Sequence, residues 1–303
     1  MKPFGIRQLS AGLLAFLLAI SLLPGQGQAA APTDETNAGG PLQPWTVAVY
    51  LCGSDLESRT WAATSDLLEM LRADFDDSLV NLYVMTGGSW SWDSQSDLRT
   101  EEESGGCYVR PDSEKTQIFQ IVNGTPAGEP VLYQPWSDEE VPHYLRNHME
   151  LRETWTRDSG GDEVPLNMSS GETLERFLEY VIDRSPTEHM MVILWDHGGG
   201  PLVGAEMDET YRDPFADAID SHMPMGEIRA ALAGAAGYRQ EKLSEGGGNG
   251  PETFDLLGFD CCLMGNLEAA YELRDTAEYM LASKEVEWSF GWEYSWLETF
   301  NEP

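Results

Sequence analysis

The chain has 303 residues, enough for one large domain or two small ones. With 41% hydrophobic and 10% aromatic residues, its composition is that of a folded globular protein and excludes disorder as the main state. Because 52 acidic residues outweigh 18 basic ones and give a formal net charge of −34, the surface repels phosphate backbones and anionic lipid headgroups, which argues against nucleic-acid binding. Such a charge favours cationic ligands, and it is equally typical of a surface adapted to solubility or salt.

The N-terminus has the pattern of an export signal. Two basic residues precede an uncharged apolar run, Ala11–Leu23, and small residues follow around Ala29. This pattern predicts a signal peptide over residues 1–29 and a Pro/Gly/Thr-rich linker over residues 30–44. The run is short for a bilayer span, and the alternative is an uncleaved short anchor. We therefore expect an exported protein, secreted or periplasmic, that has no membrane attachment once the signal is cleaved.

Downstream of the linker, the chain alternates strand-like apolar runs with helical patterns. Trp45–Leu51 is rich in β-branched and aromatic residues and predicts a buried strand, and Leu79–Met85 predicts a second. Leucines at helical spacing predict a helix around residues 67–75. Thr116–Val122, followed by an Asn-Gly turn, predicts a hairpin, and the acidic stretch that continues to about Pro165 is expected to be irregular.

The alternation continues in the second half of the chain. Helices are expected from about Ser169 to Pro186, over Met225–Ala235, and from Asn266 to about Thr276. Three further apolar runs predict buried strands. These strands are Met190–Trp195, Phe254–Asp260 and Tyr279–Val286.

Strands that alternate with helices build βαβ units, so the sequence predicts a mostly parallel sheet covered by helices on both faces. We expect a single α/β domain over residues 45–303. In such sheets the chemistry gathers at the carboxyl ends of the strands, so the residues that follow Met190–Trp195 and Phe254–Asp260 are the first place to seek a site.

Two groups of reactive residues follow those strands. Asp196 and His197 precede three glycines, and Asp260 precedes the adjacent Cys261 and Cys262. If the two strands are neighbours, the imidazole faces a thiol at one edge of the sheet. That arrangement is a Cys/His nucleophile pair, in which the imidazole favours the reactive thiolate and later protonates a leaving amine. Spacing alone leaves open a histidine that only shapes a turn and a cysteine that is only structural.

The four cysteines are too few for a disulfide scaffold. Cys261 and Cys262 are neighbours on an extended chain and point to opposite faces, which makes them poor partners for each other. Cys52 and Cys107 are expected either to pair with each other or to be buried as small apolar residues.

The same residues carry a family resemblance. The blocks around His197 and Cys262, in this order, resemble clostripain-type cysteine endopeptidases, and shorter blocks extend the match over nearly all of residues 45–303. The resemblance implies a caspase-like, three-layer α/β/α sandwich with strand order 2-1-3-4-5-6, in which the third and fourth strands are adjacent. The matching blocks are Val49–Leu51, Thr86–Gly88, Ile193–Gly200, Gly258–Gly265, Ala282–Glu285 and Gly291–Tyr294.

The resemblance also implies an activity, the cleavage of proteins or peptides after Arg or Lys with no required cofactor. His197 would be the general acid/base and Cys262 the nucleophile, with the N–H groups of Gly198 and Cys262 as the oxyanion hole. Asp260 would line the S1 pocket, because residues i and i+2 of a strand share a face and a carboxylate pairs well with guanidinium. The alternative for Asp260 is that it only caps a backbone turn.

Two features depart from the family. Cys261 stands where the family usually has alanine, which leaves two thiols as candidates, and the alignment of the following Leu263-Met264 favours Cys262. The sequence also ends soon after Gly291–Tyr294, whereas family members add a sixth, antiparallel strand. We therefore expect a domain truncated at its C-terminus, either a fragment or a chain that lacks this sheet edge.

Two further properties of relatives have candidate residues. Some relatives cut themselves after a basic residue between the His and Cys blocks, and Arg212 is the candidate here. Others depend on calcium, for which Asp208, Glu209 and Asp213 supply hard oxygen ligands, with Asp217 close by in sequence. Acidic clusters of this kind are also common on solvated surfaces.

Two other functions are weighed against the peptidase. A metal hydrolase could use Asp196, His197 and Asp208 as ligands, but the sequence lacks a second histidine at metal-site spacing. A catalytically inactive family member that binds peptides or cell-surface ligands is the main alternative.

Overall fold

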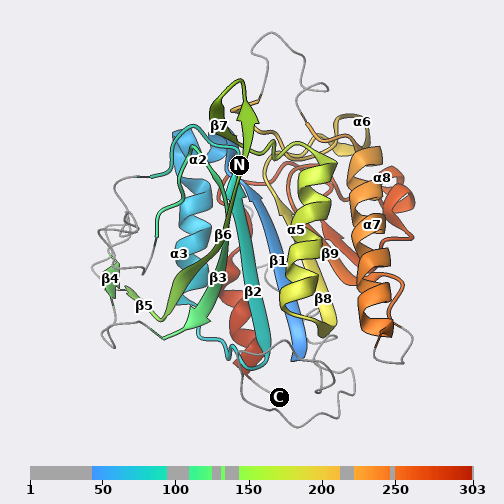
Figure 1. Ribbon diagram of the computed structural model, residues 1–303, viewed down its shortest axis with the longest axis horizontal. Coiled ribbons are helices and arrows are strands. Elements are labelled where there is room, and N and C mark those ends of the chain that lie inside the picture. Colours follow the sequence, from blue (N-terminus) through green and yellow to red (C-terminus); the bar gives the residue numbers. More distant parts are fainter. Residues whose placement is uncertain are drawn as a thin grey trace, which may run out of the picture.

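A computed structural model describes residues 43–93, 109–124, 131–133, 143–211, 222–245 and 250–301 (Figure 1). The predicted signal peptide lies outside these residues, as does most of the predicted linker, whose last two residues belong to the first strand. Within the described ranges, no helix is both long enough and apolar enough to cross a bilayer.

The centre of the described structure is an eight-stranded sheet with the order β10-β9-β8-β1-β2-β3-β6-β7. The strands from β10 to β2 run parallel to one another, and β3, β6 and β7 are antiparallel. The strands are β1 (Gln43–Cys52), β2 (Val80–Gly87), β3 (Thr116–Asn123), β6 (Asn147–Ser159), β7 (Asp162–Pro165), β8 (Thr187–Trp195), β9 (Phe254–Asp260) and β10 (Ala277–Ala282). Two short strands, β4 (Val131–Tyr133) and β5 (His143–Leu145), pair separately.

Helices cover both faces of the sheet (Figure 1). One face packs against α5, α7 and α8, and the other against α3 and the 3-10 helix η2. The sequence of β1 explains this, since alternate side chains point to opposite faces: Ala48 and Tyr50 join the first core, Val47 and Val49 the second. The helices are α2 (Ser54–Thr60), α3 (Ala62–Arg72), α5 (Gly171–Arg184), α6 (Gly200–Val203), α7 (Met225–Ser244), α8 (Leu267–Leu273) and η2 (Tyr294–Asn301).

The three-layer fold and the central strand order are those predicted. The five strands expected from the apolar runs correspond to β1, β2, β8, β9 and β10, and they lie in the expected order, with β8 beside β9. Within the described residues, β10 pairs with β9 on one side only.

The region between β2 and α5 differs from the prediction. Thr116–Val122 forms β3, but this strand pairs with β2 and with β6 rather than within a local hairpin. The acidic stretch expected to be irregular contains β6 and β7. Many side chains of β6 are charged and only partly buried, so the apolar alternation of its buried residues, such as Met149, is weak in the sequence.

Candidate active site

The His and Cys blocks lie side by side at the carboxyl edge of the sheet. Trp195, the last residue of β8, pairs with Asp260, the last residue of β9. His197 and Cys262 each follow this pair by two residues. Gly198 then packs so closely on the Cys block that a Cβ built on it would overlap the carbonyl oxygen of Cys262, so only glycine fits here.

A carboxylate that the sequence analysis missed orients His197. The imidazole, 34% exposed, has its Nε2 2.7 Å from Oδ1 of Asp55. Asp55 lies in the first turn of α2, directly after β1, and its other oxygen is 3.1 Å from Nη1 of Arg59. This contact occupies Nε2 and so leaves Nδ1 as the ring nitrogen for proton exchange with a thiol. The sequence offered one signal for this role: Asp55 follows β1, the strand that neighbours β8, and so lies at the same edge of the sheet as His197.

The two adjacent thiols have different surroundings. Cys261 is buried in the core on the α5 side, where its thiol donates to the carbonyl oxygen of Leu194 at 3.3 Å, and burial raises its pKa well above the usual range. Cys262 is half-buried, and its Sγ accepts the N–H of Glu287 at 3.3 Å. Of the two, Cys262 therefore has the more accessible sulfur.

Asp260 is buried beneath the segment 291–294. The backbone N–H of Trp292 donates to its two oxygens at 3.0 and 3.1 Å, and the Tyr294 hydroxyl donates at 3.1 Å. A Cβ on Gly291, whose φ is +58°, would lie 2.8 Å and 2.9 Å from the oxygens of Asp260. The carboxylate is only 3% exposed, and burial raises its pKa well above the usual range.

Asp260 belongs to a group of acids that we call the α3-face cluster, which consists of the buried Asp66 and Asp260 and the partly buried Glu69. Asp66, on α3, accepts the indole N–H of Trp195 at 2.6 Å. Its pKa is raised well above the usual range, first by burial and then by the charge of Asp260. Glu69 accepts the backbone N–H of Tyr294 at 2.9 Å.

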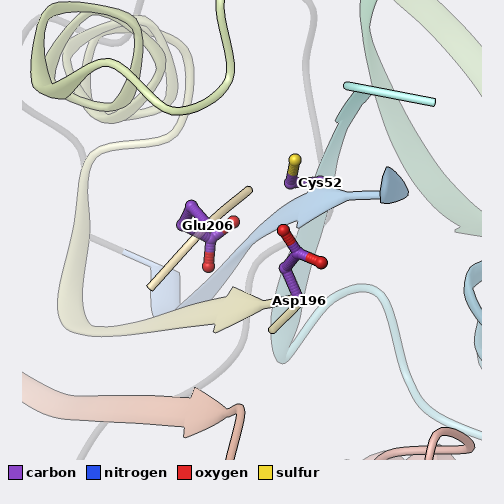
Figure 2. Close-up of side chains that lie close together, drawn as sticks. All are labelled: Cys52, Asp196 and Glu206. Carbon is purple, nitrogen blue, oxygen red and sulfur yellow. The ribbon is translucent and has the colours of Figure 1, made fainter. Parts of the chain in front are cut away.

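A second group of buried side chains lies on the other face of the sheet, at the same edge. Figure 2 shows this α5-face cluster, which consists of Cys52, Asp196 and Glu206. The hydroxyl of Ser54 donates to Asp196 at 2.5 Å, and so does the backbone N–H of Met207. Burial raises the pKa of Asp196 to about 7. The ligand set weighed for a metal hydrolase, Asp196 with His197 and Asp208, is not the set gathered here.

The remaining candidates fall into two groups. Asp208 accepts hydrogen bonds from Met168 and Thr210, and Glu209 accepts the N–H of Trp90, so both calcium candidates already have protein donors. Calcium binding stays a prediction. Arg212, Asp213, Asp217 and Cys107 lie outside the described residues, and Cys52 is a buried free thiol.

Comparison with known proteins identifies the family of the chain. Clostripain from Hathewaya histolytica is 27% identical over 202 residues, which are 60% of this chain and 35% of clostripain. The fold is similar to a secreted C11 cysteine protease from Bacteroides thetaiotaomicron, solved with an irreversible peptide inhibitor, with a TM-score of 0.51 and 19% identity over 83% of this chain and 52% of that one. The chain thus spans about a third of clostripain and about half of the Bacteroides protease. The profile of the clostripain family matches residues 49–302, and the chain belongs to that family.

Proposed function

We propose that this chain carries the catalytic domain of an exported cysteine endopeptidase that cleaves peptide bonds after Arg or Lys. The observation that carries the proposal is the meeting of two distant blocks at one sheet edge, where His197 and Cys262 each lie two residues beyond the Trp195–Asp260 pair. Family membership supports the same chemistry.

In the proposed reaction the Cys262 thiol gives its proton to Nδ1 of His197, and the thiolate attacks the substrate carbonyl. The new S–C bond leaves an oxyanion, which the N–H groups of Gly198 and Cys262 stabilise. His197 then donates its proton to the leaving amine as the C–N bond breaks. Water hydrolyses the acyl-enzyme by the reverse sequence of proton transfers. Asp55 acts as a positioning residue, because it accepts from Nε2 and stabilises the imidazolium.

The α3-face cluster is the proposed S1 pocket. Asp260 lies two residues before Cys262, and Asp66 beside it adds a second carboxylate with one buried oxygen that has no hydrogen-bond donor among the described residues. Within the part of the chain that the structure describes, Asp66 and Asp260 form no ion pair with a basic side chain. Two such carboxylates suit an arginine or lysine side chain of a substrate, which would form charge-assisted hydrogen bonds with them.

Substrate access requires a movement in this proposal. The segment from Glu285 to Trp292 lies along Cys262: Leu263 donates to the carbonyl of Glu285 at 3.0 Å, and the N–H of Glu287 reaches the sulfur. A basic side chain reaches Asp260 only when Gly291 and Trp292 give way. The donors that now satisfy Asp260 are neutral, so a guanidinium can replace them at a gain in electrostatic energy.

Export and self-processing complete the proposal. Residues 1–29 have the signal-peptide pattern, and the similar Bacteroides protease is described as secreted. Arg212 is the proposed self-cleavage site. Incubation of the unmodified chain and of the Cys262→Ala variant tests this assignment. A cut after Arg212 is expected in the unmodified chain only, and a cut in both proteins or in neither overturns the assignment.

The test of activity compares the full chain with Cys262→Ala and the matched Cys261→Ala on amide substrates that end in Arg, Lys or Leu. Hydrolysis is expected for Arg and Lys, with a loss of about a thousandfold or more in Cys262→Ala. Cys261→Ala is expected to keep most of the activity.

Other results support other functions. Activity that resists a thiol alkylator but is lost to a chelator supports the metal hydrolase. No turnover, with peptides still bound, supports an inactive binding protein.

A further inference from the structure

We propose that the α5-face cluster, Cys52, Asp196 and Glu206, is a buried binding site for a divalent transition-metal ion of the zinc type. The three residues come from three segments: the end of β1, the end of β8 and the loop that follows α6. Figure 2 shows that the three side chains lie close together.

The geometry is close to that of a metal site. One ligand atom from each residue lies within 4.8 Å of the others, and the three residues are 0%, 3% and 0% exposed, respectively. Ligand atoms around a tetrahedral zinc ion are about 3.5 Å apart, given metal–sulfur and metal–oxygen distances of about 2.3 and 2.1 Å. Binding therefore needs the ligand atoms to approach one another by no more than about 1.3 Å.

An unsatisfied oxygen points to a ligand. Oε2 of Glu206 is fully buried and has no hydrogen-bond partner among the described residues. Its other oxygen has a weak contact, with the Cys261 thiol at 3.9 Å. A buried carboxylate oxygen with no donor is costly, and a bound cation would remove that cost.

Charge supports the same conclusion. Among the described residues, neither Asp196 nor Glu206 forms an ion pair with Lys, Arg or a histidine. The charge of His197, the next residue in the chain, acts to lower the pKa of Asp196 but does not outweigh burial, which raises it. The other ionisable groups packed around the cluster, Tyr50, Asp208 and Cys261, bring no positive charge. With all three groups ionised the cluster carries −3, so a divalent ion leaves −1 and releases the protons that the groups otherwise hold.

The donor set selects the class of ion. A thiolate is a soft ligand and carboxylates are hard, a combination that favours a borderline ion such as Zn²⁺ over Ca²⁺ or Mg²⁺. Cys261, whose sulfur contacts Glu206, or a water molecule would complete four-coordination. Such an ion would tie the end of β1 to the residue before His197, and so hold the His block in place.

The experiment uses the full chain with Cys262→Ala, which removes the half-buried thiol that could bind zinc with His197. The protein is incubated with Zn²⁺, dialysed against metal-free buffer, and measured for metal by mass spectrometry and for Tm with and without a chelator. We expect about one zinc per chain and a Tm that the chelator lowers by at least about 5 °C. An equal concentration of Ca²⁺ is expected not to displace the zinc.

Variants separate the site from other zinc ligands. Adding Cys52→Ser or Glu206→Gln should lower zinc affinity by about a hundredfold or more and abolish the chelator effect on Tm. Glu57→Gln is the matched control: it alters an equally buried carboxylate, held by Thr64 and Asp93, and should keep the metal. Sub-stoichiometric zinc with a chelator-insensitive Tm, or Glu206→Gln protein that keeps its zinc, overturns the proposal.

Discussion

The two clusters at the carboxyl edge of the sheet differ in what surrounds equally buried carboxylates. In the α3-face cluster, Asp260 and Asp66 accept N–H and O–H donors from Trp292, Tyr294 and Trp195. In the α5-face cluster, Asp196 also accepts such donors, from Ser54 and Met207, but Glu206 has only a weak contact with the Cys261 thiol. Each cluster retains one carboxylate oxygen without a donor among the described residues.

The atoms that surround the carboxylates indicate which cation each cluster suits. Neutral donors around Asp260 can be exchanged for the planar donors of a guanidinium, and the cluster lies under a surface segment that can move. The α5-face cluster is enclosed by the core and offers sulfur as well as oxygen, which suits a small ion. Burial alone does not distinguish the two; the neighbouring atoms do.

The largest effect is expected from Asp260→Asn. Removing the charge of Asp260 in the proposed S1 pocket should lower kcat/KM for an Arg substrate roughly 10²- to 10³-fold, the equivalent of about 3 to 4 kcal/mol, and change turnover of a Leu substrate little. The measurement is kcat/KM on both substrates. Glu206→Gln, in the other cluster, is expected to leave the ratio of Arg to Leu turnover unchanged. Equal turnover of Arg and Leu substrates by the unmodified chain contradicts the S1 assignment.

A smaller effect is expected from Asp55→Ala. The α5-face cluster is proposed to hold the backbone segment that carries His197, not the imidazole itself. The orientation of the imidazole then depends on a separate carboxylate, that of Asp55. We expect kcat to fall about 10- to 100-fold with KM within about twofold, since the residue acts through His197 rather than on substrate. Asp55→Asn, which keeps an acceptor, should recover part of the loss.

Arg59→Ala is the control for Asp55, because it removes the other partner of this carboxylate at a position whose side chain is 74% exposed. It should change kcat by less than about twofold. A loss as large as that of Asp55→Ala would show that the ion pair, not the contact with His197, is what matters.

The pH dependence of stability tests the α3-face cluster. Burial raises the folded-state pKa of Asp66 and Asp260 above their unfolded values, so the folded chain binds more protons than the unfolded chain once the pH exceeds about 4. The free energy of unfolding should therefore fall as the pH rises from 5 to 8, by about 1 to 3 kcal/mol in urea denaturation. Asp66→Asn should show a smaller fall; a stability that rises over this range contradicts the expected sign.

The smallest effect is expected from Tyr294→Phe. The change removes one donor to Asp260 and should lower the free energy of unfolding by about 1 kcal/mol, measured by urea denaturation. Tyr271→Phe, at a side chain that is 65% exposed, is the control and should change stability by less than about 0.5 kcal/mol. Zinc content should be the same in both, because neither residue touches the α5-face cluster. A loss of zinc in Tyr294→Phe would show that the clusters are coupled.

The central strands were predictable because buried parallel strands form nearly continuous apolar runs, as in Met190–Trp195 and, with Asp255 as an interruption, Phe254–Asp260. The same principle explains the failure at β6, where partly buried or exposed charged side chains interrupt the apolar residues. A strand that is buried on both faces of the sheet is therefore much easier to predict from the sequence than a strand that is buried on one face.

The site was predictable only where a motif marked it. His197 and Cys262 follow strands that were recognised, but Asp55 lies 142 positions before His197 and carries no motif of its own. Glu206 belongs to a loop whose path depends on tertiary contacts, including the N–H of Glu206 bound to the carbonyl of His197. Gly291 and Trp292 cover Asp260, and their position likewise depends on how the segment after β10 folds back on the sheet.

The pairing of Trp195 with Asp260 has a consequence for how this fold can change during evolution. A single residue separates Trp195 from His197, and a single residue separates Asp260 from Cys262. Each added or deleted residue would turn one of these candidate catalytic side chains toward the wrong layer. Insertions in the long excursions between strands leave this alignment untouched. Lineages of this fold should therefore diverge freely in their loops while these two short spacers keep a constant length.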